Sequence, residues 1–189
     1  MTDDRDASDI HSPAVRAVIA AVLSTAVLVG AAFLAINRLH SSASNAVEHP
    51  GPAATDAQTQ SEVVEQAKDI VAIAALQQPT ASYLLMSCKD HDNPPYQGAV
   101  YLDFQLPPDV SADQYFRTIA AAMVAHGWRE GLPPNQHMFG RNLSKDGVNA
   151  LLYPDRDSTT HGIGRIYGQC QDMNSHRGTA WVDVTDQLH

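Results

Sequence analysis

The sequence is poor in basic residues and almost without cysteine. Lys and Arg number 12 against 21 Asp and Glu, which gives a net charge of −9. This excess of negative charge repels nucleic acid and anionic lipid headgroups, so we expect no nucleic acid among the partners of the folded domain. Cys88 and Cys170 are the only cysteines. Together with the single Cys-x2-His at residues 88–91 they are too few for the paired short spacings of a zinc site.

Motifs for catalysis and cofactor binding are also missing. There is no Gly-x-Ser-x-Gly, and Gly162-Ile163-Gly164 lacks the third glycine and the following helix of a phosphate loop. Asp90-x-Asp92 and Asp155-x-Asp157 lack the central glycine and the final glutamate of a calcium loop. The nine histidines are scattered. We therefore expect no catalytic residue, no cofactor and no metal site.

The most prominent feature that is present is the uncharged apolar run at residues 17–36. About 20 apolar residues span a hydrocarbon core of roughly 30 Å, so the run predicts a single transmembrane helix. A cleaved signal peptide has an apolar region of only about 7–15 residues, and Ser44-Asn45-Ala46, which could serve as its small-x-small cleavage site, lies well past the run. A lipoprotein signal needs a cysteine just after the run, and the first cysteine is Cys88.

The flanking charges predict the orientation of this helix. Arg5 and Arg16 precede it and Arg38 follows it, a slight excess of positive charge on the N-terminal side. We therefore expect a cytoplasmic tail at residues 1–16 and the remainder of the chain outside the plasma membrane. Two cysteines in an oxidising compartment suit a Cys88–Cys170 disulfide, with two free thiols or a shared metal as alternatives.

Residues 37–58 are rich in Ser, Ala, Pro and Gly and predict a flexible linker, which leaves residues 59–189 as one domain. A capping box at residues 59–62 predicts a helix of about 17 residues that ends at Pro79. A second helix is expected after Ser111, followed by Gly127 and Trp128. Its predicted buried stripe is Phe116, Ile119, Ala120 and Met123.

Alternation of apolar and polar residues predicts the strands. Residues 81–88 are expected to turn Leu84, Met86 and Cys88 inward, and residues 99–106 to turn Val100, Leu102 and Phe104 inward. Further strands are expected at residues 138–143, 148–153 and 163–170, with an edge strand at 179–185. Helices followed and interleaved by strands in this order predict an α+β domain, with two helices packed on an antiparallel sheet of about five to six strands.

Several short motifs punctuate this predicted domain: Cys88 early, Gly127-Trp128 after a helix, Lys145-Asp146-Gly147 in a hairpin, and Gly168-Gln169-Cys170 late. Behind one apolar helix and an Ala/Pro/Thr tether, this combination resembles small membrane-anchored or exported proteins of mycobacteria and related high-GC Gram-positive bacteria. Most of these proteins have no known function. The resemblance implies a domain in the cell envelope and assigns no functional residue.

The function expected from the sequence is therefore non-catalytic. We interpret the chain as a membrane-tethered extracytoplasmic domain that binds a protein or a cell-envelope component. One alternative is a cell-envelope enzyme or its accessory subunit, whose site should gather around His91, His161 and the acidic loops 89–97 and 154–162. Another is a small-ligand binding domain that uses the concave face of the sheet.

Overall fold

Two α-helices and a seven-stranded sheet make up the part of the chain that the computed structural model describes, residues 52–89, 93–176 and 178–189. These residues belong to one compact unit, residues 46–189. The tail, the apolar run and residues 37–51 of the linker expected from the sequence lie outside the described residues. Among the described helices, none has both the length and the apolar character needed to cross a membrane.

The elements follow one another as helix, two strands, helix and five strands, closed by a short 3₁₀ helix. They are α2 (Asp56–Ala74), β1 (Gln77–Ser87), β2 (Tyr96–Gln105), α3 (Ala112–Ala125), β3 (Arg129–Glu130), β4 (Arg141–Lys145), β5 (Val148–Pro154), β6 (His161–Tyr167), β7 (Val182–Asp183) and η2 (Thr185–Leu188).

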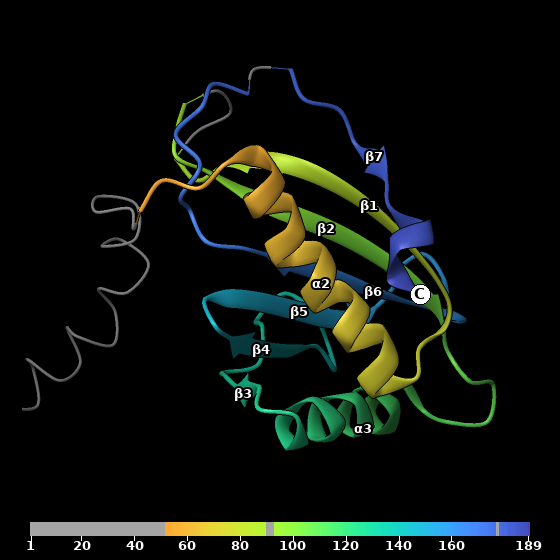
Figure 1. Cartoon of the computed structure of the whole chain (residues 1–189). Helices are drawn as coiled ribbons and strands as arrows, with labels where there is room; N and C mark the ends of the chain where they lie inside the picture. The colour runs from red at the N-terminus through yellow and green to blue at the C-terminus, as the bar shows by residue number, and fades with distance from the viewer. Residues whose placement is uncertain (1–51, 90–92, 177) are drawn as a thin grey trace, which may run out of the picture. The chain divides into compact units, whose positions relative to one another are not determined.

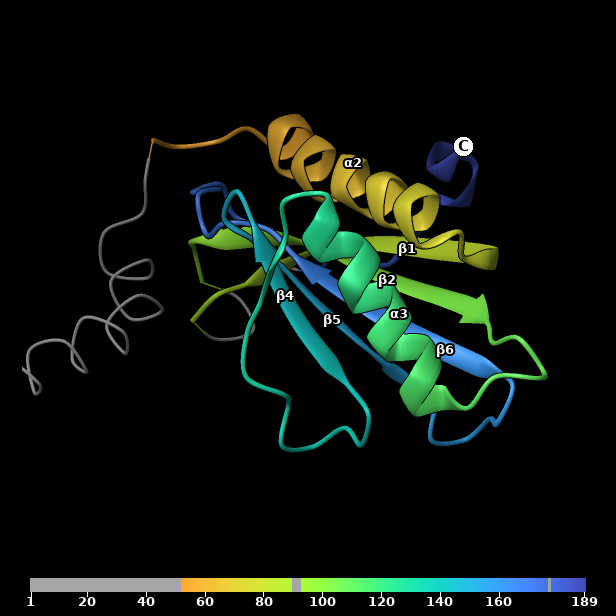
Figure 2. The same ribbon diagram turned by 90° about the horizontal axis from the view of Figure 1, so that it is seen from below.

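The sheet is antiparallel throughout, in the order β3-β4-β5-β6-β2-β1-β7. Figures 1 and 2 show α2 and α3 on the same face of it, so the predicted α+β architecture is confirmed. β7 lies within the edge strand expected at residues 179–185. The strand that the sequence did not predict is β3, because it is only two residues long and alternation cannot be recognised over two residues.

Helix α2 begins one turn earlier than the sequence predicted. Its N-cap is Thr55, whose hydroxyl accepts the N–H of Gln58 at 3.3 Å, while the Gln58 side-chain oxygen accepts the N–H of Thr55 at 2.9 Å. Thr59, the predicted cap, is 2% exposed inside the helix. Thr55 to Gln58 is itself a capping box, and it places Asp56 in the first turn, where the helix dipole stabilises a carboxylate.

The end of α2 also differs from the prediction, because Pro79 does not stop it. The helix ends at Ala74, and Ala75 takes a left-handed conformation with φ 48°. Pro79 lies inside β1, where the register shifts between Gln77 and Thr80. A proline is tolerated in a strand at such an irregularity because no ladder hydrogen bond is lost there.

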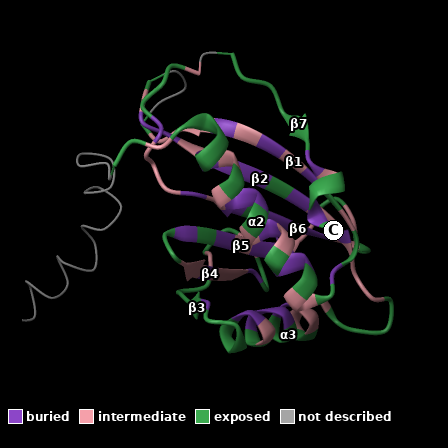
Figure 3. Cartoon of the chain, viewed as in Figure 1, coloured by how far each residue is buried: buried purple, intermediate pink, exposed green. Residues whose placement is uncertain are grey.

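Helix α3 matches the prediction in its cap, its buried stripe and its end. The Ser111 hydroxyl caps the N–H of Gln114. Gly127 has φ +91°, and the N–H of Trp128 returns to the carbonyl of Met123 at 3.1 Å, which buries the indole against the core. The buried residues of α3 are Phe116, Ile119, Ala120 and Met123. They belong to the same core as Leu102, Phe104 and Ile166 of the sheet. Figure 3 shows buried residues on both helices and on the central strands.

The predicted inward face of β1 is wrong. Tyr83 pairs with Val100 of β2, whose side chain is in the core, so Ala81, Tyr83 and Leu85 face the helices. Leu84 and Met86 turn to the other face and are half-buried. Residues 83–86 are apolar at both parities, so hydrophobicity could not decide between the two faces, and a one-residue error reverses every side chain.

Candidate functional site

The structure joins Cys88 and Cys170 in a disulfide, with 6.2 Å between the two Cα atoms. Cys88 follows the end of β1, and Cys170 lies three residues past β6. The bridge therefore holds the start of the C-terminal segment, residues 168–184, against the β1–β2 connection.

The two loops of the enzyme hypothesis are not brought together. His161 pairs with Gln105 at the end of β2, whereas the loop 89–97 leads into the beginning of β2 at Tyr96. The two loops thus lie at opposite ends of the same strand. His161 Nδ1 lies 2.7 Å from Asp103 Oδ1, and His91 lies outside the described residues.

The face of the sheet opposite the helices carries the most distinctive surface of the described chain. We call it the open face. Its residues alternate with the core residues along β1, β2, β5 and β6, and the register places Tyr101 directly opposite Arg165. The side chains of this parity on the four strands are Ser82, Leu84, Met86, Ala99, Tyr101, Asp103, Asn149, Leu151, Tyr153, Ile163, Arg165 and Tyr167.

Rings and one guanidinium form a continuous series across the open face, which we call the aromatic row: Trp181, Tyr101, Arg165, Tyr153 and His137. Trp181 meets Tyr101 edge-on with 6.4 Å between ring centroids. The Arg165 guanidinium carbon lies 5.9 Å from the ring centroids of both Tyr101 and Tyr153. His137 stacks on Tyr153 at 3.7 Å. Each member comes from a different strand or loop, so the whole fold is needed to assemble the row.

A groove of about 450 Å³ lies along one half of the aromatic row. Its lining comes from β1, β2, β6 and the segment before β7: Ser82, Met86, Ala99, Val100, Tyr101, Arg165, Tyr167 and Trp181. Trp181 is 50% exposed although it is one of only two tryptophans. Aromatic, Met and Arg side chains are the ones that concentrate the free energy of binding at protein interfaces.

The charge of Arg165 is not neutralised by an ion pair within the part of the chain that the structure describes. By contrast, Arg117 and Arg141 each pair with Asp113, and Arg141 also pairs with Glu130. Desolvation, followed by the charge of neighbouring groups such as Asp155, raises the pKa of Tyr101. The groove therefore presents a cation beside neutral phenols, which suits a ligand group with negative charge.

A second hollow, of about 700 Å³, borders the other end of the aromatic row at His137. It lies between residues 134–139 and residues 154–156. Desolvation, and then the charges of Arg156 and Arg165, lower the pKa of His137. A neutral imidazole is the form that stacks on Tyr153 without a cost in desolvated charge.

The two edge strands of the sheet, β3 and β7, are only two residues long. Flanking residues extend their pairing with the inner strands: the N–H of Gly131 donates to the carbonyl of Asn142 on β4, and the N–H of Val184 donates to the carbonyl of Ala81 on β1. Long unpaired edges are the usual sites of strand addition. The edge strands of this sheet, by contrast, are short.

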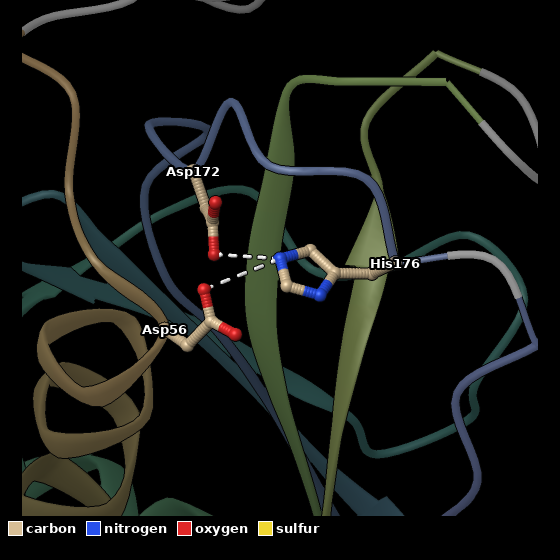
Figure 4. Close-up of side chains that lie close together, drawn as sticks. All are labelled: Asp56, Asp172 and His176. Carbon is tan, nitrogen blue, oxygen red and sulfur yellow. Dashed lines mark hydrogen bonds and ion pairs between the residues drawn. The ribbon is translucent and has the colours of Figure 1, made fainter.

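One further cluster unites residues distant in the sequence, Asp56, Asp172 and His176 (Figure 4). His176 Nε2 lies 3.0 Å from Asp172 Oδ2 and 3.5 Å from Asp56 Oδ1. Asp56 is the first residue of α2, and the other two residues lie in the segment after Cys170. One potential metal ligand from each side chain lies within 4.8 Å of the other two.

The alternation predicted for residues 99–106 turns Tyr101 outward, but the sequence did not single out the other residues of the aromatic row or of the Asp56–Asp172–His176 cluster. Arg165 and Tyr167 belong to a strand in which two of the three inward positions, Gly162 and Gly164, are glycines, so its inward and outward residues differ little in hydrophobicity. Asp172 and His176 lie outside regular structure, and Asp56 is more than a hundred positions away. No local pattern connects them.

Comparison with known proteins gives one family. The family model described as "Putative lipoprotein LppJ" matches residues 55–187. The proteins described as "Putative lipoprotein LppJ" from Mycobacterium tuberculosis strain H37Rv and from Mycobacterium bovis are each 37% identical over 174 residues, covering 89% of this chain and 90% of theirs. The mycobacterial resemblance expected from the sequence is confirmed. No solved structure matches the chain significantly.

Proposed function

This chain belongs to the LppJ family, and from that premise we propose that it is a non-catalytic binding domain held at the outer side of the plasma membrane. The observation that carries the proposal is the aromatic row with its groove, a surface rich in binding side chains on the face that no helix covers. The family description as a lipoprotein supports a place at the membrane, facing outward.

For the attachment we propose the apolar run at residues 17–36, not a lipid. A lipoprotein carries its lipid on a cysteine near the N-terminus, and this chain has no cysteine before Cys88. Cys88 and Cys170 are joined to each other, so neither thiol is available for a lipid. A reporter fused after His189 should be active only if it functions outside the cytoplasm. Activity of a cytoplasm-only reporter at this position would contradict the orientation.

The partner that suits the open face is a protein of the cell envelope that presents a carboxylate beside an apolar side chain. The carboxylate would pair with Arg165, which lacks an ion pair among the described residues, and the apolar group would lie against Tyr101 and Trp181. Because the edge strands β3 and β7 are only two residues long, we expect side-chain recognition on this face without strand addition.

The test is site-specific photo-crosslinking with the full chain in its native membrane. A photoreactive residue at Trp181 should give a discrete protein adduct, and the same residue at Glu65, exposed on the outer side of α2, should not. Arg165→Met keeps much of the apolar stem but removes the charge, and it should strongly reduce the Trp181 adduct. Equal adducts from both positions, or an adduct that Arg165→Met leaves unchanged, would refute the proposed surface.

A second candidate, binding of a small ligand, is favoured by the groove volume of about 450 Å³, which falls in the usual range for ligand pockets. Native mass spectrometry of the full chain extracted from its own membrane separates the two. A retained small molecule that is lost in Arg165→Met, without any protein adduct at Trp181, would favour this candidate over a protein partner.

A further inference from the structure

Asp172 has the most demanding surroundings of any carboxylate in the described chain, because its residue is 0% exposed. Its Oδ1 accepts the N–H of Asn174 at 2.9 Å, and its Oδ2 faces His176 Nε2. A buried carboxylate is tolerated when a positive charge or a metal ion compensates it. The buried carboxylate of Asp172 therefore requires a compensating positive charge beside it.

The imidazole of His176 alone cannot compensate the charges of the two carboxylates. Its Nε2 carries at most one hydrogen, yet Asp172 and Asp56 both approach this atom, at 3.0 and 3.5 Å. One N–H can be well directed to only one of them. Even a protonated imidazole leaves the three side chains with a net negative charge, and a neutral imidazole leaves two. Three potential ligand atoms thus converge with an excess of negative charge.

Two buried tyrosine hydroxyls give an independent indication. Tyr83 and Tyr96 are 7% and 1% exposed, and among the described residues neither hydroxyl has a hydrogen-bond partner. Tyr96 lies opposite Asp172 in a β-bridge, and its ring meets the imidazole of His176 edge-on at 5.0 Å. A buried hydroxyl without a partner, on a ring that contacts His176, indicates that an additional hydrogen-bonding group belongs at this cluster.

Tyr83 lies on the strand next to Tyr96. It pairs with Val100, but a Cβ at Gly98 would lie only 3.3 Å from its ring edge, two positions nearer to Tyr96 along β2. The ring of Tyr83 therefore leans along β2 in the direction of Tyr96.

We propose that Asp56, Asp172 and His176 bind one divalent cation of the zinc class. A set of two carboxylates and one imidazole combines oxygen and nitrogen donors, which Zn²⁺ accepts and which the all-oxygen preference of Ca²⁺ disfavours. Three protein ligands leave a position for water, as in open zinc sites. The side chain of Asp56 is 57% exposed and can rotate to complete the set.

The bound ion would hold the first residue of α2 to the C-terminal segment, two residues past the disulfide at Cys170. Such an ion stabilises the folded chain by binding it in preference to the unfolded chain. Coordination of the ion also requires a lone pair on Nε2 of His176, so this atom must carry no hydrogen in the bound state.

The experiment is Zn²⁺ titration of the full chain in detergent, after treatment with EDTA and dialysis, by isothermal calorimetry. The thermal midpoint is measured with and without Zn²⁺. We expect one equivalent of tight binding and a higher midpoint. Asp56→Asn and His176→Gln should each weaken that binding at least tenfold. Asp56 is exposed, so its variant should fold, which circular dichroism checks directly.

The matched control is His161→Gln, which removes the imidazole of the His161–Asp103 pair and should leave the tight equivalent unchanged. Histidines outside the described residues are present in every variant, so their contribution cancels. The proposal is overturned if Zn²⁺ binds wild type and His176→Gln alike, if His161→Gln is equally impaired, or if Ca²⁺ binds and Zn²⁺ does not.

Discussion

Replacing Gly98 with alanine tests how closely helix α2 lies on the sheet. Gly98 is a core-facing residue of β2 directly beneath this helix. A Cβ at this position would lie 2.6 Å from the carbonyl oxygen of Thr59 and 2.8 Å from Val63 Cγ2. The carbonyl belongs to the helix backbone and cannot rotate away. To restore ordinary contact at 3.4 Å, α2 must shift by about 0.8 Å.

Two opposing effects set the size of the change. Overpacking of a dense core costs about 1–3 kcal/mol. Alanine also restricts the unfolded chain relative to glycine, which returns about 0.4–1 kcal/mol. We expect the free energy of unfolding to fall by about 1–2 kcal/mol. For a domain of this size that corresponds to a decrease of roughly 3–8 °C in the melting temperature.

Urea denaturation and thermal melting of the full chain measure both quantities. The control is Gly131→Ala, because the nearest atoms to a Cβ there are at 3.6 Å, an ordinary contact distance. Its stability should stay within about 0.5 kcal/mol of wild type. If Gly98→Ala is as stable as Gly131→Ala, α2 does not lie as close to β2 as the structure has it.

Three further results are expected. Replacing Cys88 and Cys170 with serine should lower the free energy of unfolding by up to about 4.5 kcal/mol for a loop of 82 residues, measured by urea denaturation; two reactive thiols in the non-reduced wild type would contradict the bridge. Phe116→Ala should cost about 3–5 kcal/mol because the side chain is fully buried, and an unchanged melting temperature would refute its place in the core. The lowered pKa of His137 means that below about pH 6.5 the unfolded chain binds more protons, so stability should fall from pH 7 to pH 5. His137→Gln should reduce this slope in urea midpoints measured across that range, and an identical slope would exclude the residue as its source.

Helix α3 could be predicted almost completely because everything that defines it is local. Ser111 supplies the cap, the apolar stripe repeats at helical spacing, and Gly127 takes the positive φ that ends it. The hairpin at Asp146-Gly147 is local in the same way, with φ +50° and +87° at its two turn residues. Such features depend on a few neighbouring residues and need no knowledge of the tertiary structure.

Where the sequence allows two local structures at the same place, local patterns do not determine which one forms. Both Thr55 and Thr59 begin a possible capping box, and the structure uses Thr55, which leaves Thr59 to face the sheet. In β1 both parities are apolar, and only the pairing of Tyr83 with Val100 selects the inward set. In each case tertiary packing selects between two local arrangements that the sequence favours about equally.

The candidate sites could not be predicted because tertiary structure creates them. The aromatic row takes one member from each of five strands or loops, and its spacing along the sequence has no period. Asp56 meets His176 only because α2 begins beside the segment that follows the disulfide. The residues around a single arginine or histidine in a strand or loop do not indicate which distant side chains it will contact in the folded chain.

The way the chain enters the domain has a mechanical consequence. Ala54 is the first described residue with a backbone partner: it donates its N–H to Gln171 and runs parallel to the chain at Asp172. Tension transmitted along the preceding residues would reach Ala54 before it reaches α2. From there part of the load would cross the Ala54–Gln171 hydrogen bond to a segment that the disulfide joins to Cys88, at the end of β1. A domain tethered at this point would therefore share the load between α2 and a segment that is covalently anchored to the sheet.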